Sequence, residues 1–251
     1  MAVLTIVHRL SSIVHNLHQG WDTGVSRAGT DLTADMVAGE KPRLRGWSHA
    51  AAAVGSVVLT VLLCWASRGE WPKMAAMLVF GLSMVEMYTV SAIYHIGRWR
   101  ERCWRVLRSL DHANIFLLIA GTYTPLAVVM LTGGLQVALL TSIWLLALVG
   151  VGLSIFARRL PRSTRSTLYV GMGWVSLLAL PALMEVLPLT AIGLLVLGGV
   201  LNTAGAIIYA RQRPDPFPRV FGFHEVFHLL VIAGNIAFVA VIVLWVLPYR
   251  A

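Results

Sequence analysis

Four ionisable side chains of this sequence have the types and spacing of a metal-binding site. His224 and His228 stand four residues apart in the segment HEVFH, so a helix places both imidazoles on one face. His95 and Asp111 come from two other segments of the chain. Three neutral imidazoles, with a carboxylate or a water in the fourth position, are typical of an open zinc site. We therefore predict that His95, His224, His228 and Asp111 bind a zinc ion.

Two further polar residues lie beside these ligands. Ser91 precedes His95 by one helical turn, so it could orient a ligand or hold a metal-bound water, or it could be a small residue that permits close helix contact. Glu225 completes the H-E-x-x-H pattern of metalloproteases, in which the glutamate activates water, but it could equally serve the start of its helix. An intramembrane protease also needs a carboxylate ligand after this motif, and no acidic residue follows Glu225 in the sequence. We therefore do not favour a protease.

The elements that carry these residues are too apolar for a soluble domain. Hydrophobic residues make up 58% of the 251 and charged residues 12%, whereas soluble domains carry roughly 25% charged residues. A membrane-spanning helix needs about 20 mostly apolar residues. Seven segments qualify, namely 46–66, 74–97, 110–131, 135–157, 167–187, 189–210 and 223–248. We predict an all-α integral membrane protein with a seven-transmembrane helix bundle, in which Pro188 alone separates the fifth and sixth spans.

The basic residues predict the orientation of this bundle. The net charge of +9 would suggest nucleic acid as the partner of a soluble protein, but here the arginines lie in short connections between apolar segments. Seventeen of the 20 lysines and arginines fall in the N-terminal tail and in the connections after the second, fourth and sixth spans. By the positive-inside rule, the N-terminus is cytoplasmic and the C-terminus lies outside. We expect a multi-pass protein of the cell membrane that contacts anionic lipid and no nucleic acid.

This topology brings the four predicted ligands to one depth. His95 lies near the end of the second span, Asp111 opens the third, and the HEVFH segment opens the seventh, so all four fall at cytoplasmic helix ends. One buried histidine alone would be better explained by a hydrogen bond to a neighbouring helix, but four groups at one depth favour a metal. Glu86, nine residues before His95, lies about 13 Å deeper and cannot bind the same ion.

Residues 1–44 form a separate region ahead of the membrane domain at 45–251. Residues 1–19 have the apolar periodicity of an amphipathic helix on the membrane surface, and residues 20–44 read as a polar linker. His8, His15 and His18 share one side of this helix and could bind metal, but we favour a solvated polar face. The opening segment lacks the features of a cleavable signal peptide.

Three strings around the predicted ligands resemble a known family. They are SAIYH (Ser91–His95), DHANIFLLIAGTYTP (Asp111–Pro125) and FGFHEVFHLLVIAG (Phe221–Gly234). At these strings the chain resembles the hemolysin III family, which belongs with the progestin and adipoQ receptors (PAQR) and, more remotely, with the alkaline ceramidases. The resemblance implies seven spans and a zinc ion on the cytoplasmic side. It places the family's Ser-x3-His, Asp and His-x3-His on Ser91, His95, Asp111, His224 and His228.

The sequence also departs from the family pattern. The segment from Arg45 to His49 at the start of the first span is not the acidic one of the commonest bacterial members, and a later family histidine is replaced near Phe238. These departures leave the ligands intact but bear on the substrate or partner.

The chemistry of such a site predicts the function. We expect an intramembrane, ceramidase-like zinc hydrolase of a lipid amide or ester, with Asp111 as general base or water-linked ligand and Ser91 beside it. The alternative is a non-catalytic regulator of membrane lipid composition or stress response, in which zinc holds three spans together. A hemolysin is the least favoured, since a bundle inserted in its own membrane has no evident route to another cell. A membrane lipid is the expected substrate or effector, and the oligomeric state stays open.

Overall fold

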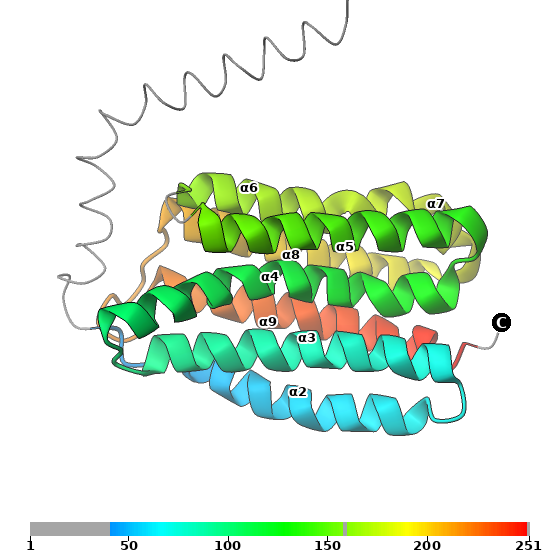
Figure 1. Ribbon diagram of the computed structural model, residues 1–251, viewed down its shortest axis with the longest axis horizontal. Coiled ribbons are helices and arrows are strands. Elements are labelled where there is room, and N and C mark those ends of the chain that lie inside the picture. Colours follow the sequence, from blue (N-terminus) through cyan, green and yellow to red (C-terminus); the bar gives the residue numbers. More distant parts are fainter. Residues whose placement is uncertain (1–40, 158–159, 250–251) are drawn as a thin grey trace, which may run out of the picture. The chain divides into compact units, whose positions relative to one another are not determined.

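Apolar segments in lipid must satisfy their backbone hydrogen bonds internally, and a helix does this within one segment. The computed structural model describes residues 41–157 and 160–249, which form the helical bundle of Figure 1. The long helices are α2 (Trp47–Ala66), α3 (Trp71–Ile96), α4 (Glu101–Met130), α5 (Gly133–Phe156), α8 (Leu189–Arg211) and α9 (Phe223–Val241). The shorter ones are α6 (Arg162–Gly173), the 3₁₀ helix η1 (Trp174–Leu178), α7 (Leu180–Val186) and the π-helical turn η2 (Ile242–Val246). The predicted all-α membrane fold is confirmed.

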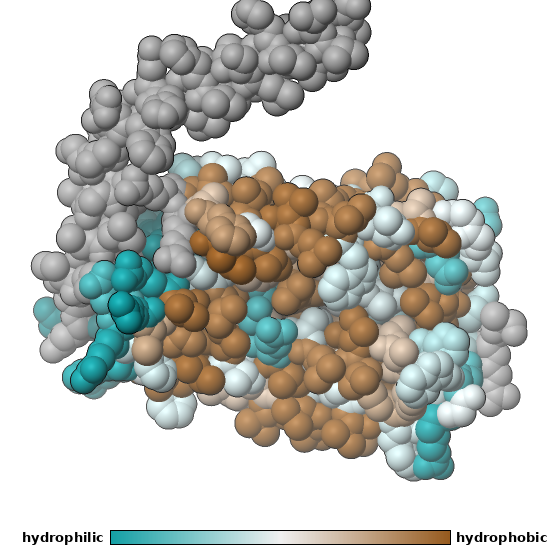
Figure 2. Space-filling model, in the orientation of Figure 1, coloured by the Kyte–Doolittle hydropathy of each residue, from teal (hydrophilic) through white to brown (hydrophobic). Residues whose placement is uncertain are grey.

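The helices run along one common direction, and most pack on their neighbours in sequence. α2, α3, α4 and α5 lie side by side in that order, while α8 packs on α9 (Figure 1). α6 packs mainly on α8, α9 returns to α2, and η2 contacts α4, so the two ends of the membrane domain meet. Figure 2 shows hydrophobic residues over much of the visible face between two more hydrophilic ends, as a protein surrounded by lipid requires.

The fifth span differs from the prediction of one helix over 167–187. It consists of α6 with η1 followed by α7, and these two parts are bent by 54° relative to each other. Pro181 lies in the first turn of α7, where proline is tolerated but cannot continue a preceding helix. Over the described residues, six helices are thus long and apolar enough to cross a membrane, and the number is seven if the bent pair is one broken span. Pro188 precedes α8 and ends the fifth span as predicted.

The helix that contains the third span begins before residue 110, where the predicted span starts. α4 begins at Glu101, and its first turns carry arginines that hydropathy excludes from a span. Arginine and leucine are good helix formers, so the helix continues beyond its apolar part. The result is a basic helical extension at the end of the bundle that also holds the starts of α2 and α9 (Figure 1).

Small residues allow the helices to approach closely. A Cβ atom at Gly81 of α3 would overlap the Thr60 side chain of α2, and one at Gly121 of α4 would overlap Ser83 of α3. Small side chains at such crossings are typical of membrane helix packing, where van der Waals contact replaces the hydrophobic effect.

A buried lysine joins the start of α3 to the end of the chain. The Lys73 ammonium forms an ion pair with Glu70 at 2.8 Å and donates to the carbonyl oxygens of Leu247 at 3.3 Å and Tyr249 at 2.6 Å. These carbonyls lie beyond η2, where a helix leaves acceptors unsatisfied. Lys73 therefore completes the hydrogen bonding of the last turn, at the end of the bundle opposite to the histidines.

Two predictions are not tested by the described residues. The predicted amphipathic helix at 1–19, with His8, His15 and His18, and most of the linker at 20–44 lie outside them. The bundle has a basic end and an opposite end, but the side of the membrane that each end faces stays a prediction.

Candidate metal centre

Three histidines from two helices converge at the basic end of the bundle. His95 lies in the last turn of α3, and His224 and His228 lie in the first two turns of α9. One ligand nitrogen from each lies within 4.8 Å of the other two. The Nε2 atoms of His95 and His224 are 3.1 Å apart. Two nitrogens that each bind a tetrahedral zinc ion at about 2.0–2.1 Å lie about 3.3 Å apart, so the spacing suits a shared ion.

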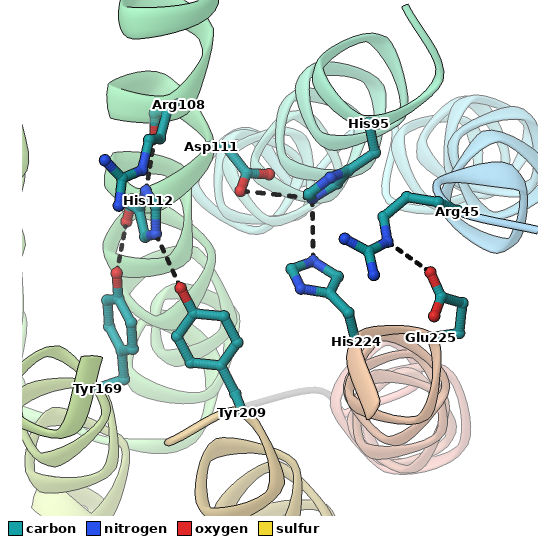
Figure 3. A network of polar contacts seen from close by, with 9 residues as sticks. All are labelled: Arg45, His95, Arg108, Asp111, His112, Tyr169, Tyr209, His224 and Glu225. Atoms are coloured by element: carbon teal, nitrogen blue, oxygen red, sulfur yellow. Dashed lines mark hydrogen bonds and ion pairs between the residues drawn. The ribbon is translucent and has the colours of Figure 1, made fainter. Parts of the chain in front are cut away.

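Asp111 and Ser91 complete one side of this cluster. Asp111 Oδ2 lies 3.8 Å from His95 Nε2, and Figure 3 shows the carboxylate turned toward that ring. Asp111 Oδ1 and Ser91 Oγ are buried and have no hydrogen-bond partner within residues 41–157 and 160–249. The two side chains are neighbours, although their geometry is not that of a hydrogen bond. Buried oxygens of this kind beside three imidazoles fit a metal ion and its water.

His112 belongs to a different network, although it follows Asp111 directly. Its Nδ1 lies 2.6 Å from the Arg108 carbonyl oxygen, and its Nε2 lies 3.2 Å from the Tyr209 hydroxyl. Tyr169 donates to the backbone carbonyl of His112 at 3.2 Å. Figure 3 shows this ring pointing toward the tyrosines and away from His95 and His224. Both nitrogens are therefore engaged, and His112 is not part of the metal cluster.

Glu225 faces away from the cluster and serves the start of α9. Its Oε1 accepts from Arg45 Nε at 2.6 Å, and its Oε2 accepts from the backbone N–H of Gly222 at 2.7 Å. Of the two roles open for Glu225 in the sequence, the structure supports the helix start and not water activation, because both oxygens are already occupied. Glu86 is exposed on the outer surface of α3 and contacts neither the cluster nor its ligands.

Three arginines give the neighbourhood of the cluster a positive potential. Arg108, Arg162 and Arg165 all lie close enough to His112 for electrostatic interaction. The Arg162 guanidinium lies 5.8 Å from the centre of the Tyr209 ring, and the Arg165 side chain is buried. The sequence predicted these arginines only as topology signals and lipid contacts. The placement of Arg162 and Arg165 near Tyr209 depends on the packing of α6 on α8, which the sequence does not show.

A cavity of about 150 Å³ lies next to the cluster. Its walls come mainly from α4, α6, η1, α8 and α9, and they are predominantly apolar. Along α9 the lining runs from Phe227 to Phe238, which is about 16 Å, or half the thickness of a hydrocarbon core. Phe227 also packs against the rings of His224 and His228, with centroids 5.8 and 5.6 Å apart. Phe227 therefore contacts both the cavity and the rings of His224 and His228.

The fold and the cluster define a multi-pass membrane protein with a buried histidine and carboxylate centre at one end of its bundle. A family model described as "Haemolysin-III related" matches residues 38–239. Hemolysin-3 of Bacillus cereus is 34% identical over 203 residues, which cover 80% of this chain and 90% of that protein. The Hemolysin-3 homolog of Bacillus subtilis (strain 168) is 33% identical over 172 residues, 68% of this chain and 78% of the homolog.

A human protein matches at lower identity. Monocyte to macrophage differentiation factor is 25% identical over 211 residues, which cover 82% of this chain and 83% of that protein. The chain therefore belongs to the haemolysin III-related family of membrane proteins, as its motifs predicted.

Proposed function

We propose that this protein is an intramembrane zinc hydrolase that cleaves a lipid amide or ester. The observation that carries the proposal is the apolar cavity beside the cluster, because a structural metal site has no need of one. An acyl chain that filled the cavity would bring its carbonyl end toward Phe227 and the histidines. The scissile bond would then lie near the headgroup boundary, where water is available.

The chain supplies the groups that such a reaction needs. His95, His224 and His228 would hold the ion, which when bound would polarise a carbonyl and activate water. Asp111 Oδ1 is a buried acceptor without a donor among the described residues, so it can take a proton from the attacking water. The same carboxyl group can return that proton to the departing amine or alcohol. Ser91 would position the carboxyl group or the water, and Arg108, Arg162 and Arg165 would favour an anionic headgroup or product.

The second candidate is a regulator without turnover, in which zinc is structural. It is favoured by one observation, namely that the ligands join α3 to α9, helices far apart in the sequence. A bound ion would then contribute its binding energy to the stability of the bundle.

Asp111→Asn separates the two candidates. An amide has nearly the same shape as the carboxylate but cannot accept a proton, so a hydrolase should keep its zinc and its melting temperature while losing turnover by 10²-fold or more. The measurements are zinc content, melting temperature and release of fatty acid from mixed lipid amides and esters. Asp215→Asn is the matched control, because Asp215 lies in the connection before α9 and accepts from the backbone N–H of Phe223.

The result that contradicts the hydrolase is equally clear. If wild type binds zinc but releases no fatty acid from any lipid, and His224→Ala lowers zinc content together with the melting temperature, the regulator is the better description.

A further inference from the structure

The start of α2 contacts each element that carries a predicted histidine ligand. Arg45 pairs with Glu225, the neighbour of His224. Gly46 has φ +84°, and a Cβ atom there would lie 2.9 Å from the Cβ atom of His95. His49, in the first turn of α2, stacks on His228. None of these three contacts follows from a metal-ligand motif, and together they make α2 part of the centre.

His49 has the closest of these contacts. Its ring lies parallel to that of His228, with centroids 3.8 Å apart and an interplanar angle of 13°. It also makes an edge-type ring contact with Tyr88, with centroids 5.1 Å apart, and the Tyr88 hydroxyl accepts from Asn235 at 2.8 Å. The His49 side chain is completely buried. The His228 ring is thus held in plane by a rigid neighbour, which is itself held by α3 and α9.

Packing alone does not explain why this neighbour is a histidine. In the part of the chain that the structure describes, both ring nitrogens of His49 and Nδ1 of His228 are buried without a hydrogen-bond partner. The His228 backbone carbonyl is near His49 but not in hydrogen-bonding geometry. A buried polar group without a partner costs about 1–3 kcal/mol, so phenylalanine would be the cheaper residue at a purely structural position.

A metal-binding histidine normally uses its second ring nitrogen as a donor, which fixes the tautomer and the orientation of the ring. His228 Nδ1 has no protein acceptor among residues 41–157 and 160–249, and the nearest unused nitrogens belong to His49. Because the rings are parallel, a direct bond between them is excluded, but one water at the ring edges can join them. His49 itself lies outside the group of three histidines whose nitrogens converge within 4.8 Å.

We propose that His49 is a positioning residue of the metal centre, which fixes the plane and the tautomer of His228 by stacking and through a shared water. The inference rests on the proposed metal site but not on hydrolysis. If so, the buried nitrogens of His49 lower the stability of the metal-free bundle and raise its affinity for zinc.

His49→Phe tests this role, because it keeps a flat buried ring against His228 and removes only the nitrogens. We expect zinc affinity, measured by competition with a chromophoric chelator, to fall by about 10- to 100-fold. The visible absorption spectrum of the cobalt-substituted protein should change, since it reports ligand geometry. The melting temperature of the metal-free protein should stay the same or rise. Should the Phe variant fail to fold, His49→Leu removes the nitrogens together with the stacked ring and should lower zinc affinity at least as much.

Ser56→Ala is the matched control, because Ser56 is buried on α2 two turns beyond His49 and its hydroxyl donates to the Ala52 carbonyl of the same helix. It should leave zinc affinity and the cobalt spectrum unchanged. Wild-type affinity and spectrum in His49→Phe would overturn the proposal, and so would an equal loss in Ser56→Ala. Wild-type protein that binds zinc without hydrolysing lipid would overturn the hydrolase and leave the role of His49 intact. Wild-type protein that binds no metal would overturn both.

Discussion

Each imidazole has two nitrogens, so a group of buried imidazoles lowers the stability of the protein unless hydrogen bonds or a metal ion satisfy these atoms. The rings of His95, His224 and His228 lie within 5.0 Å of one another by centroid, and His49 stacks on the last of them. Hydrogen bonds among neutral rings satisfy only part of this set, because each ring carries one donor and one acceptor. A metal ion would use three acceptor nitrogens at once, which is the physical reason for preferring it to a hydrogen-bonded cluster.

Single histidine substitutions should distinguish the residues that bind zinc from those that only lie near it. His95→Ala should lower zinc content from about one ion per chain to near zero, because only two imidazoles remain. His112→Ala should leave zinc content unchanged, since His112 bonds to Arg108 and Tyr209 instead. Elemental analysis of protein purified without chelators measures both. Equal loss of zinc in the two variants would contradict this assignment.

Glu225→Gln should affect stability and spare the chemistry. The amide can still accept from Gly222 but loses its charge opposite Arg45, so we expect a loss of about 1–2 kcal/mol in the free energy of unfolding. Zinc content should not change, and lipid hydrolysis should fall by less than tenfold. A loss of 10²-fold or more in turnover, with zinc still bound, would instead identify Glu225 as a general base.

The sequence predicted that His95, His224 and His228 converge, and it missed the residues around them. Their convergence could be predicted because the i, i+4 spacing and the positions at the ends of apolar segments do not depend on how the helices pack. The roles of His49 and Arg45 could not be predicted. One histidine in an apolar segment is explained by a hydrogen bond to a neighbouring helix, and one arginine in a basic segment is explained by topology. Only the contact of α2 with α9 shows that both adjoin the centre.

At the scale of elements, close helix contact depends on glycines that face larger side chains. Gly81 of α3 lies where a Cβ atom would be 2.7 Å from the Cβ atom of Thr60, close to the α2 backbone. Gly55 of α2 has no atom within 4 Å of the same position. A glycine-to-alanine substitution therefore adds the same methyl group in a tight environment at Gly81 and in an open one at Gly55.

Alanine at these two positions should therefore have opposite effects. Gly81→Ala should destabilise the protein by about 1–3 kcal/mol, because Thr60 cannot move without shifting α2. Gly55→Ala should stabilise it by up to about 1 kcal/mol through helix propensity. Thermal unfolding in detergent micelles measures both changes. A destabilisation of similar size at both positions would mean that helix spacing is not set at Gly81.

Element boundaries were predictable where hydropathy changes sharply. The sequence predicted the break between α7 and α8 correctly because Pro188 directly precedes α8. The basic first turns of α4 were missed because helix formation does not require apolar residues. The 3₁₀ segment Trp174–Leu178 was missed because it has the same apolar composition as a regular span, so only the backbone geometry distinguishes it.

At the scale of the whole molecule, the bundle has a basic end that holds the centre and an opposite end that holds Lys73 and the last turn. Anionic lipids and the positive-inside rule favour the basic end in the cytoplasm. A substrate would then reach the centre from the inner leaflet.

A reporter fused after Ala251 tests this orientation. An odd number of spans with a cytoplasmic N-terminus puts the fusion outside, so a periplasmic or extracellular reporter should be active and a cytoplasmic one inactive. A reporter fused after Arg213, in the connection between α8 and α9, is the matched control and should behave in the opposite way. An active cytoplasmic reporter at Ala251 together with an active external reporter at Arg213 would mean that the bent pair α6–η1 and α7 enters and leaves the membrane on one side.

The ammonium of Lys73 has a practical consequence for how the chain can be handled. Its hydrogen-bond acceptors are the carbonyls of Leu247 and Tyr249, so the chain can be lengthened beyond Ala251 without disturbing them. Shortening is another matter. A truncation before Leu247 would leave Lys73 buried beside Glu70 alone, with a charge that has lost its backbone acceptors. Purification tags should therefore be added at this end of the chain, and no residues should be removed from it.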